Sequence, residues 1–133
     1  MIAKTVKYKD YNGVEREETF LFNLTEAEVT EMQLSINGGL GEMIKELITA
    51  KDSAQVIKIF KELLLKSYGE KTLDGKRFRK VDDRNIPLSI AFSETEAYSK
   101  LFLELATDDA KAAEFVNGIM PASATEAAKN TNN

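Results

Sequence analysis

The sequence lacks the two side chains that most often carry catalysis and metal binding near neutral pH. Its 133 residues include no cysteine and no histidine. The absence of cysteine excludes disulfides, thiol nucleophiles and thiolate metal sites. The absence of histidine excludes Ser-His-Asp and Cys-His catalysis. Carboxylate chemistry, lysine chemistry and metal sites built only from oxygen ligands stay open.

Long apolar runs and an excess of positive charge are also missing. No stretch approaches the roughly 18 apolar residues that a transmembrane helix needs, and the polar start of the chain does not resemble a signal peptide. We therefore expect a protein of the cytosol with no membrane partner. The net charge of −4 argues against a nucleic-acid partner, which would require basic charge concentrated on one face.

A β-hairpin is predicted over residues 2–22. Polar and apolar residues alternate in the first segment, residues 2–9. Residues 10–13 read Asp-Tyr-Asn-Gly, and Asn-Gly tolerates the positive φ of tight hairpin turns. Residues 14–22 form the returning strand, rich in threonine, phenylalanine and leucine. A lone hairpin is marginally stable, so we expect it to pack on helices or to pair with another chain.

Helix periodicity and capping signals predict about five amphipathic helices over residues 25–121. We expect the fold class to be α+β and mostly α, in one domain spanning residues 1–121, with residues 122–133 as a disordered tail. The expected helix limits are Thr25 to Asn37, Gly39 to Lys51, Asp52 to Gly69, Ser93 to Ala106, and Thr107 to Gly118.

The third predicted helix is apolar on more than one side. Ile57, Phe60 and Tyr68 belong to its expected inward stripe, whereas Ile59 and Leu65 fall off it. A central helix packed from two directions explains this pattern, and so does a surface for a partner. Residues 70–91 are irregular, and the sequence Leu-Asp-Gly-Lys-Arg-Phe within them is compatible with a short hairpin or a lid.

Three features resemble chemical sites, and each has a simpler structural explanation. Two adjacent aspartate pairs are explained by turns and by the first turn of a helix. The basic cluster around Phe78 is short and is followed at once by acids, so a solvated loop or a polar contact with an acidic protein partner is favoured over a nucleic-acid site. The glycines at residues 38–41 follow a helix and lack the Gly-Lys-Ser/Thr of a phosphate loop. The basic residues are Lys76, Arg77, Arg79 and Lys80, and the aspartates are Asp82, Asp83, Asp108 and Asp109. We predict no catalytic, cofactor-binding or metal-binding residues.

Two stretches of the chain match a known sequence signature. Residues 54–80 contain the sequence Tyr-Gly-Glu-Lys, followed by an Asp-Gly-x-x-Phe turn. In residues 92–121 the matching positions are Phe92, Ser93, Thr95, Ala97, Tyr98, Leu101, Phe102, Glu104, Leu105, Ala106, Thr107, Asp108, Ala112, Ala113, Phe115, Gly118, Ile119 and Pro121. Both stretches resemble tail assembly chaperones of long-tailed phages that infect Gram-positive bacteria, and the second is similar to the C-terminal signature of that family.

The resemblance implies a protein that is not an enzyme and uses no cofactor. Members of that family bind the tape measure protein, keep it soluble in the host cytoplasm and help recruit tail tube subunits. They are absent from the finished virion. Many also have a longer form made by a −1 ribosomal frameshift, and Ala128 to Asn130 are compatible with a slippery codon run. The resemblance therefore also implies the frameshifted longer form of this chain as a partner.

Apolar residues, chiefly those that fall off the inward stripes of their helices, are candidates for a partner-binding surface. The competing explanation is that these residues are buried in the core. The candidate surface residues are Ile59, Leu65, Tyr98, Phe102 and Leu103. The alternative function is that of a virion structural subunit, such as a tail or head-tail connector protein, in which the hairpin pairs between subunits. Self-association is compatible with either function, and the sequence does not decide the oligomeric state.

Overall fold

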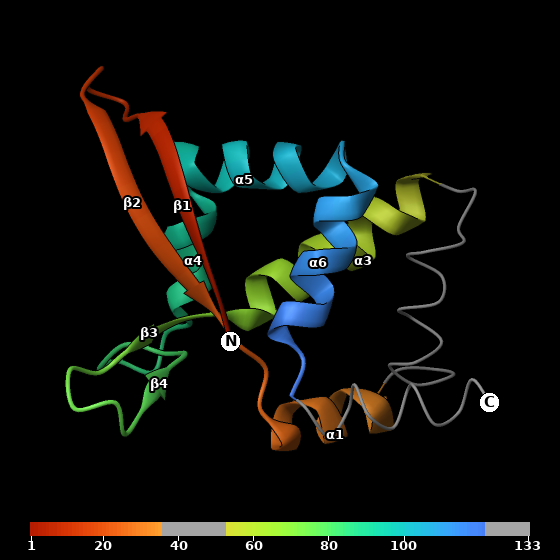
Figure 1. The fold of residues 1–133 in the computed structure, drawn as a ribbon. Helices are drawn as coiled ribbons and strands as arrows, with labels where there is room; N and C mark the ends of the chain where they lie inside the picture. Colours follow the sequence, from red (N-terminus) through yellow and green to blue (C-terminus); the bar gives the residue numbers. More distant parts are fainter. Residues whose placement is uncertain (36–52, 122–133) are drawn as a thin grey trace.

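The computed structural model describes residues 1–35 and 53–121, and Figure 1 shows their arrangement. The helix expected over residues 39–51 and the tail over residues 122–133 lie outside the described residues. The described elements are β1 (Ile2–Lys9), β2 (Glu15–Phe22), α1 (Glu26–Ser35), α3 (Ser53–Ser67), β3 (Tyr68–Lys71), β4 (Phe78–Arg79), α4 (Leu88–Ser93), α5 (Glu96–Ala106) and α6 (Asp109–Ile119).

The predicted N-terminal hairpin is confirmed. β1 and β2 pair antiparallel from Ile2↔Phe22 to Lys9↔Glu15. Gly13 has a φ of 79°, the left-handed conformation that glycine adopts at no steric cost. The Asp10 carboxylate closes the turn by accepting the backbone N–H groups of Asn12 (2.9 Å) and Val14 (3.0 Å).

The expectation of a mostly α fold with a single hairpin is wrong, because the hairpin is half of a four-stranded antiparallel sheet. The strand order is β1-β2-β3-β4. β3 pairs with β2 at Leu21↔Gly69 and Phe22↔Tyr68, and β4 pairs with β3. The short hairpin that the irregular segment allowed is therefore formed by β3 and β4, and the fold is α+β with a substantial sheet.

β3 begins at Tyr68, in a segment that the sequence predicted as the end of a helix. The backbone becomes extended after Ser67, whose carbonyl oxygen accepts the N–H of Asn23 at 2.8 Å. Gly69 then passes so close to β4 that a Cβ atom would lie 2.5 Å from the Phe78 ring. The glycine is thus required by close packing between two strands, and it does not act as a helix C-terminal residue.

Helix limits near the C-terminus also differ from expectation. Ser93 ends α4 instead of capping the next helix, and Thr95 is the N-cap of α5, accepting the N–H of Tyr98 at 3.1 Å. Asp108, rather than Thr107, caps α6 by accepting two backbone N–H groups. α6 continues through Gly118 to Ile119. Each true cap lies within two residues of the predicted one, since Ser, Thr and Asp are all competent N-caps.

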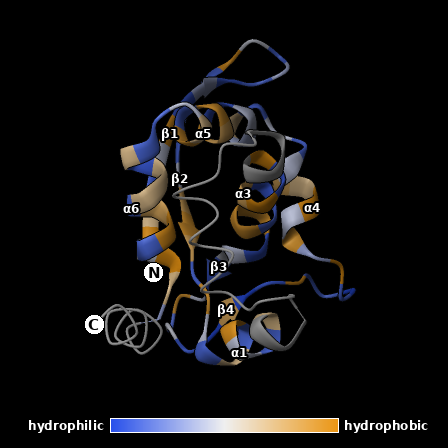
Figure 2. Cartoon of the chain, turned by 90° about the vertical axis from the view of Figure 1, so that its right-hand side faces the viewer, coloured by the Kyte–Doolittle hydropathy of each residue, from blue (hydrophilic) through white to orange (hydrophobic). Residues whose placement is uncertain are grey.

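The hydrophobic core lies between the sheet and the helices. β1 contacts both α5 and α6, and Figure 2 shows the hydrophobic helix α3 lying between α4 and α6, beneath α5. Phe22 of β2 is fully buried and makes edge contacts with Phe92 and Phe115, at centroid distances of 5.8 and 5.2 Å. Phe92 also stacks on Tyr68 at 4.2 Å. This aromatic cluster joins the sheet to α4 and α6.

Candidate partner-binding surface

α5 carries three of the five predicted surface residues and is well defined by its own sequence. Its inner stripe consists of Ala97, Leu101 and Leu105, which are all buried. Leu103 lies on the other side of the helix, and 57% of its surface is exposed. A leucine that is more than half exposed gains little from folding, so Leu103 is available for contact with another protein.

The other four apolar candidates lie in or against the core. Ile59 is only 7% exposed and belongs to the buried cluster. Leu65, Tyr98 and Phe102 are partly buried and pack against that cluster. Phe102 lies 5.9 Å from Tyr98 and 6.4 Å from Phe60, measured between ring centroids. The structure therefore leaves Leu103 as the one exposed residue among the five candidates, with Tyr98 and Phe102 on the same helix turned toward the core. Ile59 is out of reach of a partner.

Ile57 was expected to face inward, and this expectation is wrong because 44% of its surface is exposed. The core-facing stripe of α3 has Ile57 on one flank and Ile59 on the other, because each residue of an α-helix is rotated by about 100° from the one before it. Periodicity alone does not decide which flank is covered. Ile57 is thus an accessible apolar residue that sequence reasoning missed.

A further group of exposed apolar residues lies between β4 and the first turn of α4. The sequence offered no signal for them because residues 70–91 were expected to be irregular. Val81 and Pro87 form an isolated β-bridge, and the Asp82 carboxylate closes the intervening turn by accepting the N–H groups of Arg84 and Ile86. The exposed members of the group are Val81, Ile86 and Ile90.

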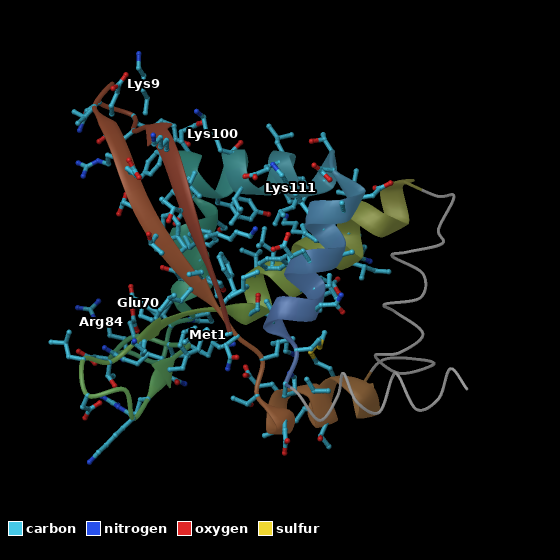
Figure 3. All side chains as sticks on the ribbon, in the orientation of Figure 1. Met1, Lys9, Glu70, Arg84, Lys100 and Lys111 are labelled. Atoms are coloured by element: carbon cyan, nitrogen blue, oxygen red, sulfur yellow. The ribbon has the colours of Figure 1, made fainter. Side chains whose placement is uncertain are left out.

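The four basic candidates do not act as one cluster. Lys76 and Arg77 are exposed in the β3–β4 turn, and Figure 3 shows Arg84 on the same side of the molecule. Arg79 pairs with Asp83 at 2.9 Å. The Lys80 ammonium is held inside the protein by Glu28 (3.0 Å) and by two backbone carbonyl oxygens. Lys76 and Arg77 remain as the accessible basic pair.

Aspartates of both acidic pairs accept hydrogen bonds from residues close to them in the sequence. Asp82 closes a turn, Asp83 pairs with Arg79 and Asp108 caps α6. Within residues 1–35 and 53–121, no group of three or more acidic residues is placed to hold a metal ion. The helices in these ranges are all too short or too polar to cross a lipid bilayer.

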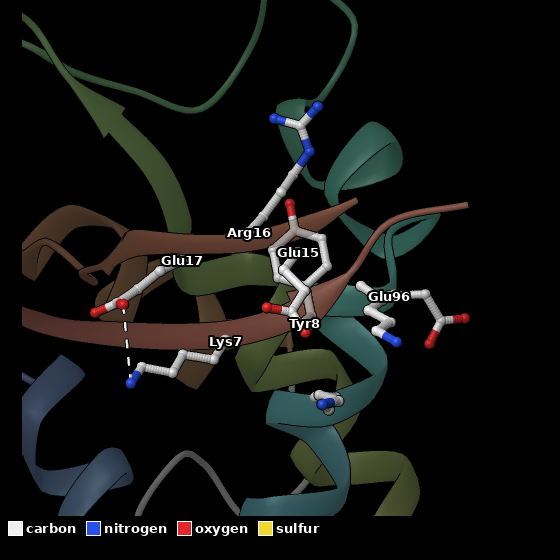
Figure 4. Close-up of a pocket in the computed structure, with 8 residues that line it drawn as sticks. Lys7, Tyr8, Glu15, Arg16, Glu17 and Glu96 are labelled. Carbon is white, nitrogen blue, oxygen red and sulfur yellow. Dashed lines mark ion pairs between the residues drawn. The ribbon is translucent and has the colours of Figure 1, made fainter. Parts of the chain in front are cut away.

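A shallow depression of about 720 Å³ lies on the hairpin beside the start of α5 (Figure 4). Its lining contains both basic and acidic residues, and Lys7 and Glu17 face each other across the two strands at 3.9 Å. The Tyr8 hydroxyl donates to the Glu18 carboxylate, which raises the pKa of Tyr8. The lining residues are Lys7, Tyr8, Lys9, Glu15, Arg16, Glu17, Glu96 and Lys100. The depression is open, and of its charged lining residues Lys7 pairs with Glu17 and Arg16 pairs with Asp10.

Comparison with known proteins identifies the family to which this arrangement belongs. No curated protein and no solved structure matches the chain. A family model described as phage tail assembly chaperone matches residues 1–133, the whole of the sequence. That family is one of assembly chaperones and not of enzymes. The match agrees with the resemblance at residues 92–121, and the chain belongs to the phage tail assembly chaperone family.

Proposed function

We propose that this chain binds the tape measure protein of its phage, keeps it soluble before assembly and helps to recruit tail tube subunits around it. The family match over residues 1–133 supports this function most directly. A long helical chain exposes apolar stripes until the tube encloses it. A protein that binds the unassembled chain suppresses its self-association until a better partner replaces the chaperone.

The same proposal sets the place and time of action. The chain acts in the cytoplasm of a Gram-positive host during assembly of a long-tailed phage, and it does not remain in the mature virion. A longer form arises by a −1 frameshift near Ala128 to Asn130, which lie outside the described residues. The resemblance at residues 92–121 supports each of these points.

The proposed contact surface is centred on Leu103 of α5. Leu103 is exposed, and Tyr98 and Phe102 on the same helix are partly buried. An amphipathic helix of the partner would cover Leu103 and the accessible edges of the two rings, as in other groove-binding helices. Leu65 contributes through its partly exposed side, whereas the buried Ile59 does not contribute.

Co-expression with the tape measure protein of the same phage tests this function. We expect the tape measure protein to be insoluble alone and to become soluble and co-purify when this chain is present. The variant Leu103→Lys should lose co-purification because it places a charge against an apolar partner helix. The control Leu73→Lys changes a fully exposed leucine in the β3–β4 turn and should retain binding.

Circular dichroism of both variants establishes whether the fold is intact. If the wild-type chain neither solubilises the tape measure protein nor co-purifies with it, the proposed function is wrong. In that case the alternative, a virion structural subunit, predicts that the chain is present in purified particles. If the chain binds and Leu103→Lys binds equally well, the function stands but the surface on α5 is wrong.

A further inference from the structure

The outer edge of β2 carries backbone groups that face away from β1. The N–H of Asp10 donates to the carbonyl oxygen of Val14 at 2.9 Å, so the even-numbered residues of the hairpin form its hydrogen-bonded pairs. The odd-numbered residues of β2 therefore direct their N–H and C=O groups outward. Asn23, two residues beyond Leu21, follows this alternation and donates its N–H to the carbonyl oxygen of Ser67 at 2.8 Å.

β3 occupies only the final part of this edge. It pairs with β2 at Leu21 and Phe22 and then diverges, so that β3 and β4 lie beside the lower end of β2 in Figure 1. The outward-facing residues before Leu21 are Glu15, Glu17 and Thr19, and all three are exposed. No described strand pairs with them on this side. Such a row of backbone donors and acceptors is a template for an added strand.

The charge along β2 determines which kind of strand fits. Glu15, Glu17 and Glu18 give the strand an acidic character, and the guanidinium of Arg16, its single base, is held by Asp10 at 2.6 Å. β1, which already pairs with the other edge of β2, is basic and carries no acid. Its charged residues are Lys4, Lys7 and Lys9.

We propose that the free edge of β2, from Glu15 to Phe20, accepts an extended lysine- or arginine-rich segment of another protein as an added strand. Backbone hydrogen bonds to Glu15, Glu17 and Thr19 hold the segment, and the glutamates select for positive charge. This site is separate from the surface on α5 and does not depend on the tape measure protein being the partner of that surface.

A second copy of this chain is the less suitable occupant. Pairing two β2 edges would bring glutamates of one copy against those of the other, which is unfavourable for directly opposed like charges. The basic strand β1 of another copy is also poorly placed, because α5 packs against β1 on the side that faces away from β2 (Figures 1 and 4).

Titration of the full-length chain with short blocked peptides tests the proposal. The first peptide alternates lysine with threonine and valine, and its twin has glutamate at every lysine position. Amide resonances and hydrogen exchange are followed by NMR. We expect the lysine peptide to bind, with new protection at the amides of Glu15, Glu17 and Thr19, and the glutamate peptide not to bind.

Two sets of variants separate charge from backbone pairing. Glu15→Lys combined with Glu17→Lys should weaken binding of the lysine peptide about tenfold and confer binding of the glutamate peptide. Thr19→Pro removes one outward N–H group and should abolish protection at this edge. Thr5→Pro is the matched control. Both proline variants remove the hydrogen bond between the Thr5 and Thr19 hydroxyl groups (2.8 Å). Thr5→Pro, however, removes an N–H group on the outer edge of β1 and leaves the edge of β2 unchanged.

Three outcomes would overturn the proposal. The first is the absence of lysine-peptide binding, and the second is equal binding of both peptides. The third is protection of Glu15, Glu17 and Thr19 that rises with protein concentration when no peptide is present, which would show that another copy takes the edge. None of these readouts uses the tape measure protein, so failure here is distinguishable from failure of the co-expression experiment.

Discussion

Lys80 shows how the fold changes the role of a single side chain. Its ammonium donates to the carbonyl oxygens of Asn23 (2.8 Å) and Lys66 (2.7 Å) and to the Glu28 carboxylate (3.0 Å). Lys66 lies in the last turn of α3, where carbonyl oxygens lack helical partners. Lys80 therefore ties together the segment before α1, α1 itself and the end of α3.

The stabilisation from Lys80 comes from satisfying these acceptors and not from burying its charge. Burial lowers the pKa of Lys80, and the neighbouring Glu28 only partly opposes that effect. The folded state thus holds this proton less tightly than the unfolded chain does. Consequently, the positive charge on Lys80 does not by itself stabilise the folded state at a pH below its folded pKa. The contribution of Lys80 to the free energy of unfolding comes from the hydrogen bonds that it donates to the three acceptors.

Replacing Lys80 with methionine should lower the free energy of unfolding by about 1–3 kcal/mol, because it leaves the Oε2 atom of Glu28 and two carbonyl oxygens without this donor. Urea denaturation followed by circular dichroism measures the loss. The control Lys111→Met removes an exposed ion pair with Glu104 at 3.0 Å and should cost much less, because a solvent-exposed ion pair contributes little to stability. Equal losses for the two variants would show that Lys80 does not join these elements.

At the scale of the element, the β1–β2 turn depends on one carboxylate. Asp10 accepts a hydrogen bond from Arg16 at 2.6 Å and from the backbone N–H groups of Val14 and Asn12. The Arg16 interaction is the main reason that the pKa of Asp10 lies below its usual value of 3.8, and the backbone N–H groups add to it. The stabilising effect of the ionised form is therefore present above the unfolded pKa and is lost as the pH falls through the folded pKa.

An NMR titration of the Asp10 carboxyl group should give a pKa below 3.8 in the wild-type chain. In Arg16→Gln the pKa should rise toward the ordinary value, because the strongest donor to the carboxylate is gone. Lys7→Gln serves as the control, since Lys7 pairs with Glu17 in the same hairpin and makes no contact with Asp10 in the described interactions. A pKa that is unchanged by Arg16→Gln would contradict this account of the turn.

At the scale of the whole molecule, Phe22 joins the sheet to the helices. It lies at the end of β2, pairs with Tyr68 of β3 and contacts Phe92 of α4 and Phe115 of α6. The side chain is fully buried. Sheet and helices therefore share one core, and we expect them to unfold together as a single cooperative unit.

Phe22→Ala should lower the free energy of unfolding by about 3–5 kcal/mol through lost burial and the cavity left behind. Phe22→Leu retains most of the volume and should cost about 1–2 kcal/mol, which keeps the test usable if the alanine variant does not fold. Far-ultraviolet circular dichroism and tyrosine fluorescence should report one shared transition. Tyr11→Ala removes a ring that is 76% exposed and should change the free energy of unfolding far less than either Phe22 variant. Separate transitions for the two probes would contradict a single core.

Local features of this protein were predictable because they depend on residues close together in the chain. The hairpin turn follows from Asp10 and Gly13, and the capping box of α1 follows from Thr25 and Glu28, whose side chains accept each other's backbone N–H groups at 3.2 and 2.9 Å. The inner stripe of α5 follows from its periodicity. The cap of α6 was misplaced by one residue, since Thr107 and Asp108 are both suitable and only the surrounding packing selects between them.

Features that depend on distant segments were missed. Ser67 to Lys71 contain no alternation that indicates a strand, and β3 forms because Leu21 and Asn23 direct their backbone groups toward it. The burial of Ile59 and the exposure of Ile57 were likewise decided by the elements that pack on each flank of α3. The four basic residues at positions 76–80 looked equivalent in sequence, yet Glu28 and two carbonyl oxygens set Lys80 apart.

The sequence by itself determined the hairpin, the amphipathic helices and the family resemblance at residues 92–121, since each depends on local periodicity, capping and spacing. Only the tertiary structure decided that β2 has a partner at Leu21 and an open edge at Glu15, Glu17 and Thr19. It also decided that Leu103 remains accessible while Ile59 does not. The physical reason is that backbone pairing and burial are properties of contacts between remote segments, which a local pattern does not encode.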